Sequence, residues 1–351
     1  MPLRLGIYLS QVVIGRVIGA GLILIVLGLS IDLIKSATDV MAEGGAVALL
    51  SYAAFRAPQV AATTFPIAVL MGATLAFLTL GARSELTVIR GAGQSIFNIL
   101  IMLIPCALAL GIVYNLLTDR LAAWSEVQLN AVFPQTVDRP GVGEEIWSRS
   151  ALAQPGAIML RSEVLRARLG AEDGSRLTDL SLWQLDGEGR ILRRSEAAEA
   201  VFQDGAWQLT GGDAGGGANW LTQLTPAAVM ELAAGRIAVS ASDAREALAG
   251  RATPTRGTAF YTTRIARSYS ALIIPGVMMM LAAIAGFGLA RAGGGPRNAI
   301  IGVALGLLYI AGDAIFASLG EVGAMGAIWA SAAPSLFFAV VALWALLVLE
   351  E

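Results

Sequence analysis

Long apolar runs dominate both ends of this 351-residue chain, and a polar block separates them. Six runs carry no charged residue: 17–31, 57–82, 91–118, 268–290, 298–312 and 322–349. The first reads on past Asp32 to residue 34, and the fifth reads on past Asp313 to residue 319. A helix needs about 20 mostly apolar residues to cross a bilayer. The pattern therefore predicts six transmembrane helices, three on each side of an inserted domain. The first run is too long for a cleavable signal peptide, so we expect it to be a span.

Alternating apolar residues predict β-strands in the polar block. The expected segments are 157–169, 177–185, 190–195, 198–203 and 206–210. Asp-Gly turn residues separate them at 186–189 and 204–205, which is hairpin chemistry. A glycine-rich loop is expected at 211–217, and Thr225-Pro226 is typical of the start of a short helix. Hairpins of this length favour a sandwich or β-jellyroll.

The predicted fold is a membrane α-helical bundle of six transmembrane helices (3+3) with an inserted β-jellyroll domain. The expected domains are spans one to three at 1–118, the sheet domain with its connecting segment at 119–267, and spans four to six at 268–351. A short surface helix is expected near 83–91, between spans two and three.

Composition agrees with a membrane protein, because 56% of the residues are hydrophobic and 14% are charged. Soluble domains carry about 25% charged residues. Only 16 of the 24 basic and 26 acidic residues lie outside residues 117–267. The net charge of −2 offers no basic field for nucleic acid. We therefore expect no nucleic-acid partner.

Missing residue types exclude several kinds of chemistry. The chain has no histidine and one cysteine, Cys106, which excludes an internal disulfide, Cys/His zinc sites and His-dependent catalytic triads. Its one lysine, Lys35, lies outside any Gly-rich phosphate-binding loop. We expect no catalytic residues, no metal and no cofactor in this chain.

Basic residues in the short loops predict the orientation. One side of the membrane would hold Arg4, Arg16, Arg83, Arg90, Arg291 and Arg297. The other would hold Lys35 and Arg56. This bias places both termini in the cytoplasm and the central block outside.

The loop at 81–93 is the most informative polar segment. Ser84 can cap a helix, and Glu85 would lie in its first turn, where a negative charge is favourable. The residues that follow are an apolar stripe, a charge and two glycines that end the helix: Leu86, Val88, Ile89, Arg90, Gly91 and Gly93. Two interpretations stay open: an interfacial turn between spans, or an amphipathic helix that docks on a cytoplasmic motor.

Charges inside the apolar runs have two interpretations each. Asp32 and Lys35 stand at helical i,i+3 spacing, so they can pair with each other or reach the interface. Alternatively, Lys35 faces a cavity and contacts a lipid phosphate or sugar. Asp313 lies at membrane depth, where ionisable residues usually face a bundle interior or cavity. It is a candidate for a gate or polar network, with ordinary packing as the alternative.

Several motifs resemble the LptF/LptG family of lipopolysaccharide export permeases. They are Phe65-Pro66 with Leu70, Gly72, Ala73 and Leu75, then Arg83-Ser84-Glu85-Leu86 and Gly91-Ala92-Gly93. Further matches are Leu180 to Trp183, Asp186 to Leu192, Trp207 to Leu209, Leu224 to Pro226, and Asp313. The resemblance covers the whole chain. Ile34-Lys35 and the Arg83–Leu86 loop are more similar to the LptG branch.

The resemblance implies an ATP-driven permease subunit that extracts lipopolysaccharide from the bacterial inner membrane and passes it to a periplasmic bridge. It implies a paralogous permease subunit, a dimeric cytoplasmic ATPase that binds ATP and Mg, and a periplasmic bridge protein with one membrane helix. The implied coupling residues are Arg83, Ser84, Glu85, Leu86, Ile89, Arg90 and Gly91. The implied lipid-binding or gate residues are Lys35, Asp32 and Asp313.

Two other classes remain as alternatives. A proton-coupled secondary transporter would use Asp32 and Asp313 as proton carriers. A non-transporting membrane assembly protein would use its spans only as an anchor.

Overall fold

The computed structural model describes most of the chain. It covers residues 2–133, 142–143, 145–152, 161–171, 173–186, 190–212, 218–220, 224–226, 229–230, 239–249, 257–292 and 295–350. The chain divides into two compact units. The helical unit comprises Met1–Val132 and Thr262–Glu351, and the sheet unit comprises Phe133–Tyr261.

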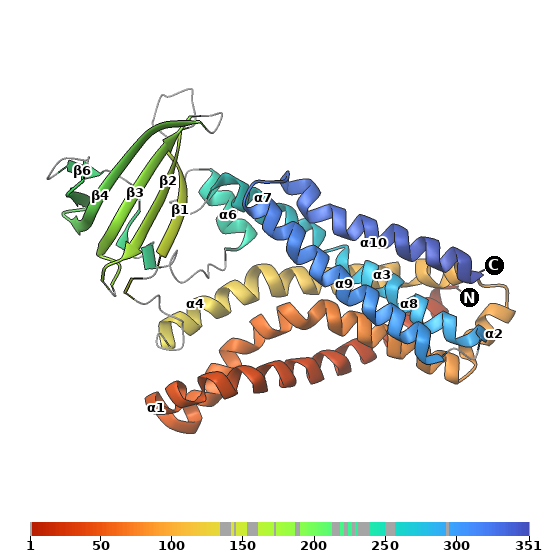
Figure 1. Cartoon of the computed structure of the whole chain (residues 1–351). Helices are drawn as coiled ribbons and strands as arrows, with labels where there is room; N and C mark the ends of the chain where they lie inside the picture. Colours follow the sequence, from red (N-terminus) through yellow and green to blue (C-terminus); the bar gives the residue numbers. More distant parts are fainter. Residues whose placement is uncertain are drawn as a thin grey trace. The chain divides into compact units, whose positions relative to one another are not determined.

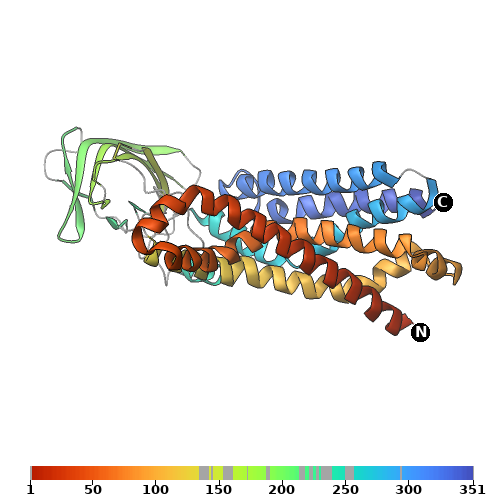
Figure 2. The same cartoon turned by 90° about the horizontal axis from the view of Figure 1, so that it is seen from below.

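Helix α1 (Pro2–Ala82) is a hairpin of two long arms. Gly44 and Gly45 leave helical geometry, and Gly45 takes the positive φ of 64° that favours glycine. The first arm (Arg4–Thr38) and the second arm (Gly44–Ala82) are each long and apolar enough to cross a membrane. The two arms run back along each other in both views (Figures 1 and 2).

Seven further helices and one π-helical turn complete the described part of the helical unit (Figure 1). They are α2 (Glu85–Gly91), α3 (Ile96–Leu116), η1 (Leu117–Leu121), α4 (Ala122–Val132), α8 (Ile274–Ala292), α9 (Gly295–Glu321) and α10 (Ala327–Glu350), and α7 (Thr258–Ser270) leads into α8. The described residues contain five helices that could cross a membrane, or six if the bent pair α7–α8 is one span. The predicted helical membrane protein is confirmed.

The core of the helical unit is apolar. Its buried side chains come from every long helix and include Val69, Phe77, Leu103, Met278, Tyr309 and Leu346. The arms of α1 approach closely where Gly72 faces Val17: a Cβ added to Gly72 would lie 2.4 Å from the Val17 Cα. The glycine therefore permits near backbone contact between the arms.

Both chain ends and α2 lie at one end of the helical unit, which we call the terminal end (Figures 1 and 2). The turn at Gly44–Gly45 lies at the opposite end, which we call the far end. The expected domain border at 118/119 falls inside η1, and the helix continues through α4 to Val132. The expected border at 267/268 falls inside α7. Charged residues end an apolar run in both places but do not end the helix.

The sheet unit holds a six-stranded antiparallel sheet in chain order, β1 to β6. The strands are β1 (Glu145–Leu152), β2 (Arg161–Leu169), β3 (Arg176–Leu185), β4 (Ile191–Gln203), β5 (Ala206–Thr210) and β6 (Ala218–Trp220). The inserted antiparallel sheet domain is confirmed. Its described strands follow one another as a meander, rather than in the crossing order that two Greek keys give a jellyroll.

The turn at Asp204–Gly205 agrees with its sequence signature. Both residues have positive φ, 50° and 80°, as a two-residue hairpin turn between β4 and β5 requires. The segments expected at 190–195 and 198–203 form one strand, β4. Neither of the residues between them, Glu196 and Ala197, is a glycine or proline that would interrupt a strand. Strands β1 and β6 were not predicted. The glycine loop at 213–217 lies outside the described residues.

One face of this sheet is apolar. Its buried side chains include Leu165, Ala167, Leu180, Leu182, Ala197 and Leu209. Trp207 is fully buried among them and donates its Nε1–H to the Leu224 carbonyl at 2.7 Å. A short helix (α6, Ala241–Leu248) follows, with a capping box formed by Ser240 and Asp243. Val229 N–H bonds to the Thr225 carbonyl, which agrees with a helical turn at Thr225–Pro226.

Candidate functional site

The surface helix expected at 83–91 exists as α2, seven residues at the terminal end (Figure 1). Leu86 is buried in the core of the helical unit, and Ile89 packs against the same core from one turn later. Val88 is 70% exposed. The predicted stripe therefore divides: Leu86 and Ile89 hold the helix on the bundle, and Val88 faces outward.

Ser84 does not cap α2 in the way the sequence predicts. It occupies the position before the helix, but with a left-handed φ of 57° and without a side-chain cap bond. The direct turn from α1 into α2 forces this conformation, since only Arg83 and Ser84 join the two helices. The side chain that does cap a helix here is Ser95, which accepts from the Asn98 N–H at 3.1 Å and starts α3.

The remaining coupling candidates lie around α2. Arg83 and Ser84 are exposed, Glu85 and Arg90 are half-buried, and Gly91 is the last helical residue. Glu85 accepts a hydrogen bond from the hydroxyl of Tyr8, in the first arm of α1, at 2.6 Å. No local sequence pattern predicts this partner, which lies 77 positions away in the chain.

A groove of about 610 Å³ lies between the two arms of α1 and the start of α2. Its polar residues gather towards α2 and include Tyr8, Gln11, Arg16, Arg83 and Glu85. The remainder is mainly apolar and includes Ile23, Met71 and Leu75. The groove therefore has a charged mouth and an apolar body.

At the far end, Asp32 is paired with Arg56 across the hairpin. Arg56 Nε lies 2.8 Å and Nη2 3.2 Å from the carboxylate oxygens. The Tyr52 hydroxyl donates to the same carboxylate at 2.9 Å. Lys35 is exposed and forms no ion pair with any residue in the described part of the chain. The carboxylate of Asp32 therefore pairs with Arg56 and not with Lys35, and the alternatives that Lys35 reaches the interface or contacts lipid stay predictions.

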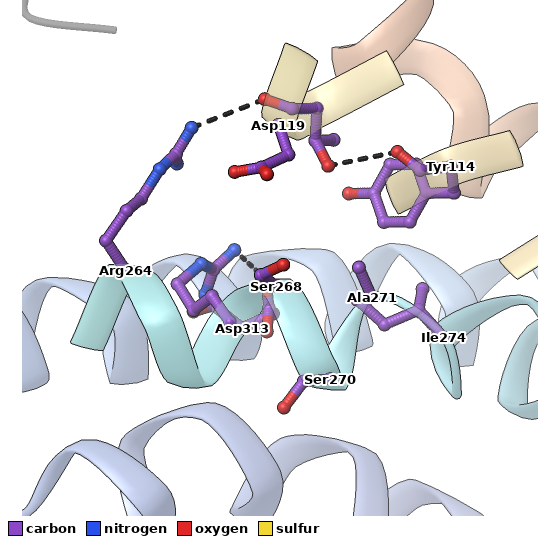
Figure 3. A pocket seen from close by; sticks show the side chains of 10 residues that line it. Tyr114, Asp119, Arg264, Ser268, Ser270, Ala271, Ile274 and Asp313 are labelled. Atoms are coloured by element: carbon purple, nitrogen blue, oxygen red, sulfur yellow. Dashed lines mark hydrogen bonds and ion pairs between the residues drawn. The ribbon is translucent and has the colours of Figure 1, made fainter. Parts of the chain in front are cut away.

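Asp313, in α9, lines a small polar cavity of about 60 Å³ (Figure 3). Its carboxylate accepts from Arg267 Nη2 at 2.8 Å, and its side chain is 16% exposed. Arg267 belongs to α7, so this pair joins α7 to α9. The candidate at membrane depth thus has an ionic partner that the sequence did not assign.

Two further polar contacts join α7 to the third span. Asn115 Nδ2 donates to Ser268 Oγ at 3.0 Å. Arg264 extends from α7 towards the segment at Asp119 and donates to the Thr118 carbonyl at 3.4 Å (Figure 3). The cavity is therefore bounded by α3, η1, α7, the start of α8, and α9.

Both helices beside this cavity are irregular. The third span contains the π-helical turn η1, and α7 and α8 meet at a 54° bend. Pro275, which has no N–H, stands in the first turn of α8 and disfavours helical geometry in the residue before it. A Cβ added to Gly111 would lie 2.3 Å from the Leu272 carbonyl oxygen, so α3 packs directly on the bend. Such irregularities are frequent at functional sites.

Comparison with known proteins decides the family. The family model of the lipopolysaccharide export system permease LptF/LptG matches residues 7–348. The chain belongs to the LptF/LptG family. It is 24% identical over 314 residues to the lipopolysaccharide export system permease protein LptG of Haemophilus influenzae. The alignment covers 82% of each of the two chains.

This LptF/LptG protein is a multi-pass membrane permease of the lipopolysaccharide export ABC system. Permeases of this family are transmembrane subunits and not ATPases, so the prediction that this chain is not itself the enzyme is confirmed. Family membership also implies that the chain works within an export transporter complex.

Proposed function

We propose that this permease couples ATP hydrolysis in a separate subunit to the movement of lipopolysaccharide out of the inner membrane, towards the periplasm. In this proposal a dimeric cytoplasmic ATPase binds ATP and Mg and docks on α2. A paralogous permease completes the lipid cavity, and a periplasmic bridge protein with one membrane helix receives the lipid. Both termini are cytoplasmic, in the bacterial inner membrane, and the sheet unit is periplasmic.

The main support for this proposal is the way helix α2 is anchored and exposed. Leu86 and Ile89 fix it to the bundle, while Val88 and the half-buried Arg90 remain accessible to a partner. A helix of seven residues is too short to be stable alone. Its position therefore depends on the bundle below it, and force applied to α2 acts on both arms of α1.

The charge distribution supports the orientation. Arg4 stands near the start of α1, Arg90 belongs to α2, and Arg16 and Arg83 line one groove with Glu85 of α2. Helix α8 ends and α9 begins at the terminal end as well (Figure 1). The positive-inside tendency then places the terminal end in the cytoplasm.

We further propose that Lys35 contacts an anionic group of the lipid, and that the Arg267–Asp313 pair belongs to a gate. An ammonium group near a membrane interface attracts phosphate. The pair joins α7 to α9 beside a bend, so a change in the bend angle alters the pairing distance. A proton-carrier role is disfavoured, since protonation of Asp32 or Asp313 would leave a guanidinium without its partner.

The docking role can be tested with a matched pair of valines. Val88 is 70% exposed on α2, and Val322, just after α9, is 71% exposed. We expect Val88→Asp to reduce co-purification of the ATPase and export of lipopolysaccharide. Val322→Asp introduces the same charge away from α2 and is expected to retain both. Equal yields and equal export for the two variants would show that α2 is only a turn between spans.

A further inference from the structure

Tyr8 and Glu85 form a hydrogen bond between the start of the first span and the start of α2. The phenol O–H donates to Glu85 Oε2 at 2.6 Å. Both side chains line the polar mouth of the groove between the two arms of α1. Hydrogen bonds to a charged acceptor are short and stronger than neutral ones, and 2.6 Å lies in that range.

Few other contacts fix the start of α2. Ser84 contributes no cap bond, and its left-handed φ is unfavourable for a residue with a side chain. Leu86 anchors the first turn on the core, one residue after Glu85. The Tyr8 hydroxyl is therefore the contact that sets the direction of the Glu85 carboxylate.

Glu85 keeps binding capacity beyond this bond. It forms no ion pair with the described residues, and Tyr8 occupies only one of its two oxygens. A carboxylate can accept several hydrogen bonds, including two from one guanidinium. Held by Tyr8 through one oxygen, the carboxylate keeps its other oxygen for a further donor.

We infer that Tyr8 is a positioning residue for Glu85. It orients the carboxylate towards a cation, an arginine or lysine, on the docked ATPase, and it joins α2 to the first arm of α1. This inference rests on the proposed docking role of α2. When α2 moves with the ATPase, the first span moves with it through this bond.

A double-mutant cycle in the assembled transporter, in lipid nanodiscs, tests the inference. The variants are Tyr8→Phe, Glu85→Gln and both together, with Tyr269→Phe as a control that deletes another exposed phenol hydroxyl. The readouts are complex yield, thermal stability, and ATP turnover with and without lipopolysaccharide. We expect Tyr8→Phe to preserve yield and thermal stability but to lower lipid-stimulated turnover about three- to tenfold, as for the net loss of one hydrogen bond at an exposed site. The double variant should be no worse than Glu85→Gln.

Each result separates the inference from the docking proposal. If Glu85→Gln behaves like the unmodified transporter, the carboxylate has no coupling role, and both the inference and this part of the docking proposal are overturned. If Glu85→Gln is defective while Tyr8→Phe is not, docking through α2 stands and the role of Tyr8 is overturned. The role of Tyr8 would also be overturned if the fold-loss of turnover in the double variant equalled the product of the two single fold-losses. Such a result would show that Tyr8 acts independently of Glu85.

Discussion

Asp32 binds Arg56 across the α1 hairpin, and Lys35, one turn further along the first arm, is left with its charge exposed. Two guanidinium nitrogens lie 2.8 and 3.2 Å from the Asp32 carboxylate. The side chains of Asp32 and Arg56 are 22% and 25% exposed, so the pair is largely shielded from solvent. The negative charge nearest to Lys35 in sequence is therefore already neutralised.

The exposed ammonium of Lys35 predicts a specific defect. Lys35→Ala should lower lipid-stimulated ATP turnover of the whole complex about tenfold, as for the loss of a hydrogen bond between charged groups. Basal turnover and complex assembly should be unchanged. Lys35→Arg should keep part of the activity because the charge remains.

A second substitution tests whether Asp32 is involved. Since Asp32 is bound by Arg56, Asp32→Ala added to Lys35→Ala should not restore turnover. Restoration would mean that the two residues interact in the working transporter, and normal export by Lys35→Ala alone would remove the lipid-contact role.

The Arg267–Asp313 pair predicts a stability effect that depends on both partners. Asp313→Asn should lower the free energy of unfolding by about 1–3 kcal/mol, less than the roughly 3–5 kcal/mol typical of a fully buried pair, because both side chains are partly exposed. Asp313→Asn with Arg267→Gln should recover part of the loss. Asp204→Asn, the same change at an exposed carboxylate in the turn between β4 and β5, provides the control. Thermal unfolding in nanodiscs measures the effect, and a double variant as unstable as the two losses added would exclude direct coupling.

Close packing of the two α1 arms predicts that Gly72 is intolerant of a side chain. A Cβ at Gly72 would lie 2.4 Å from the Val17 Cα, and backbone cannot move aside as a side chain can. Gly72→Ala should destabilise the protein by about 1–3 kcal/mol, in the range of overpacked cores. Gly19→Ala is the matched change in the first arm, because no atom lies within 4 Å of its added Cβ. Similar melting temperatures for both variants would contradict the close approach.

In the sheet unit, we expect substitution of Trp207 to lower the stability more than substitution of another tryptophan, Trp183. Trp207→Phe leaves the Leu224 carbonyl without the indole N–H that now lies 2.7 Å away, inside the core. The net loss of one such hydrogen bond costs about 0.5–1.5 kcal/mol. Trp183→Phe serves as the control, since Trp183 is half-buried and stacks against Arg194. Unfolding in denaturant can be followed by fluorescence, and the denaturant concentration at the midpoint should fall more for Trp207→Phe. A larger fall for Trp183→Phe would refute the stabilising role of the Trp207 hydrogen bond.

Much of the architecture was predictable because it depends on local sequence. Apolar runs predict spanning helices, because exposing polar groups to lipid costs free energy. The Asp204–Gly205 turn follows from its two-residue chemistry. Helix α7 was missed, because Arg264 and Arg267 interrupt the apolar pattern while their partners lie on other helices.

The site was harder to predict because its contacts join distant segments. The spacing of Asp32 and Lys35 permits pairing, but the Gly44–Gly45 turn brings Arg56 to the same place. The Tyr8–Glu85 bond depends equally on how the hairpin folds back. An aspartate at membrane depth signals a partner cation, which is the one clue to Arg267 that the sequence contains.

The close approach at Gly72 holds the first arm of α1 against the second. The backbone of Val17 lies against Gly72, whereas a Cβ added to Gly28, further along, would meet the Val60 side chain. Tyr8 stands nine residues before Val17 and Asp32 fifteen after it, about 14 and 22 Å at 1.5 Å per residue. The Asp32–Arg56 pair holds the two arms together again at the far end, so the first arm is fixed to the second both at Gly72 and beyond it. A displacement of the Tyr8 end that reached Lys35 would therefore carry the second arm of the hairpin with it.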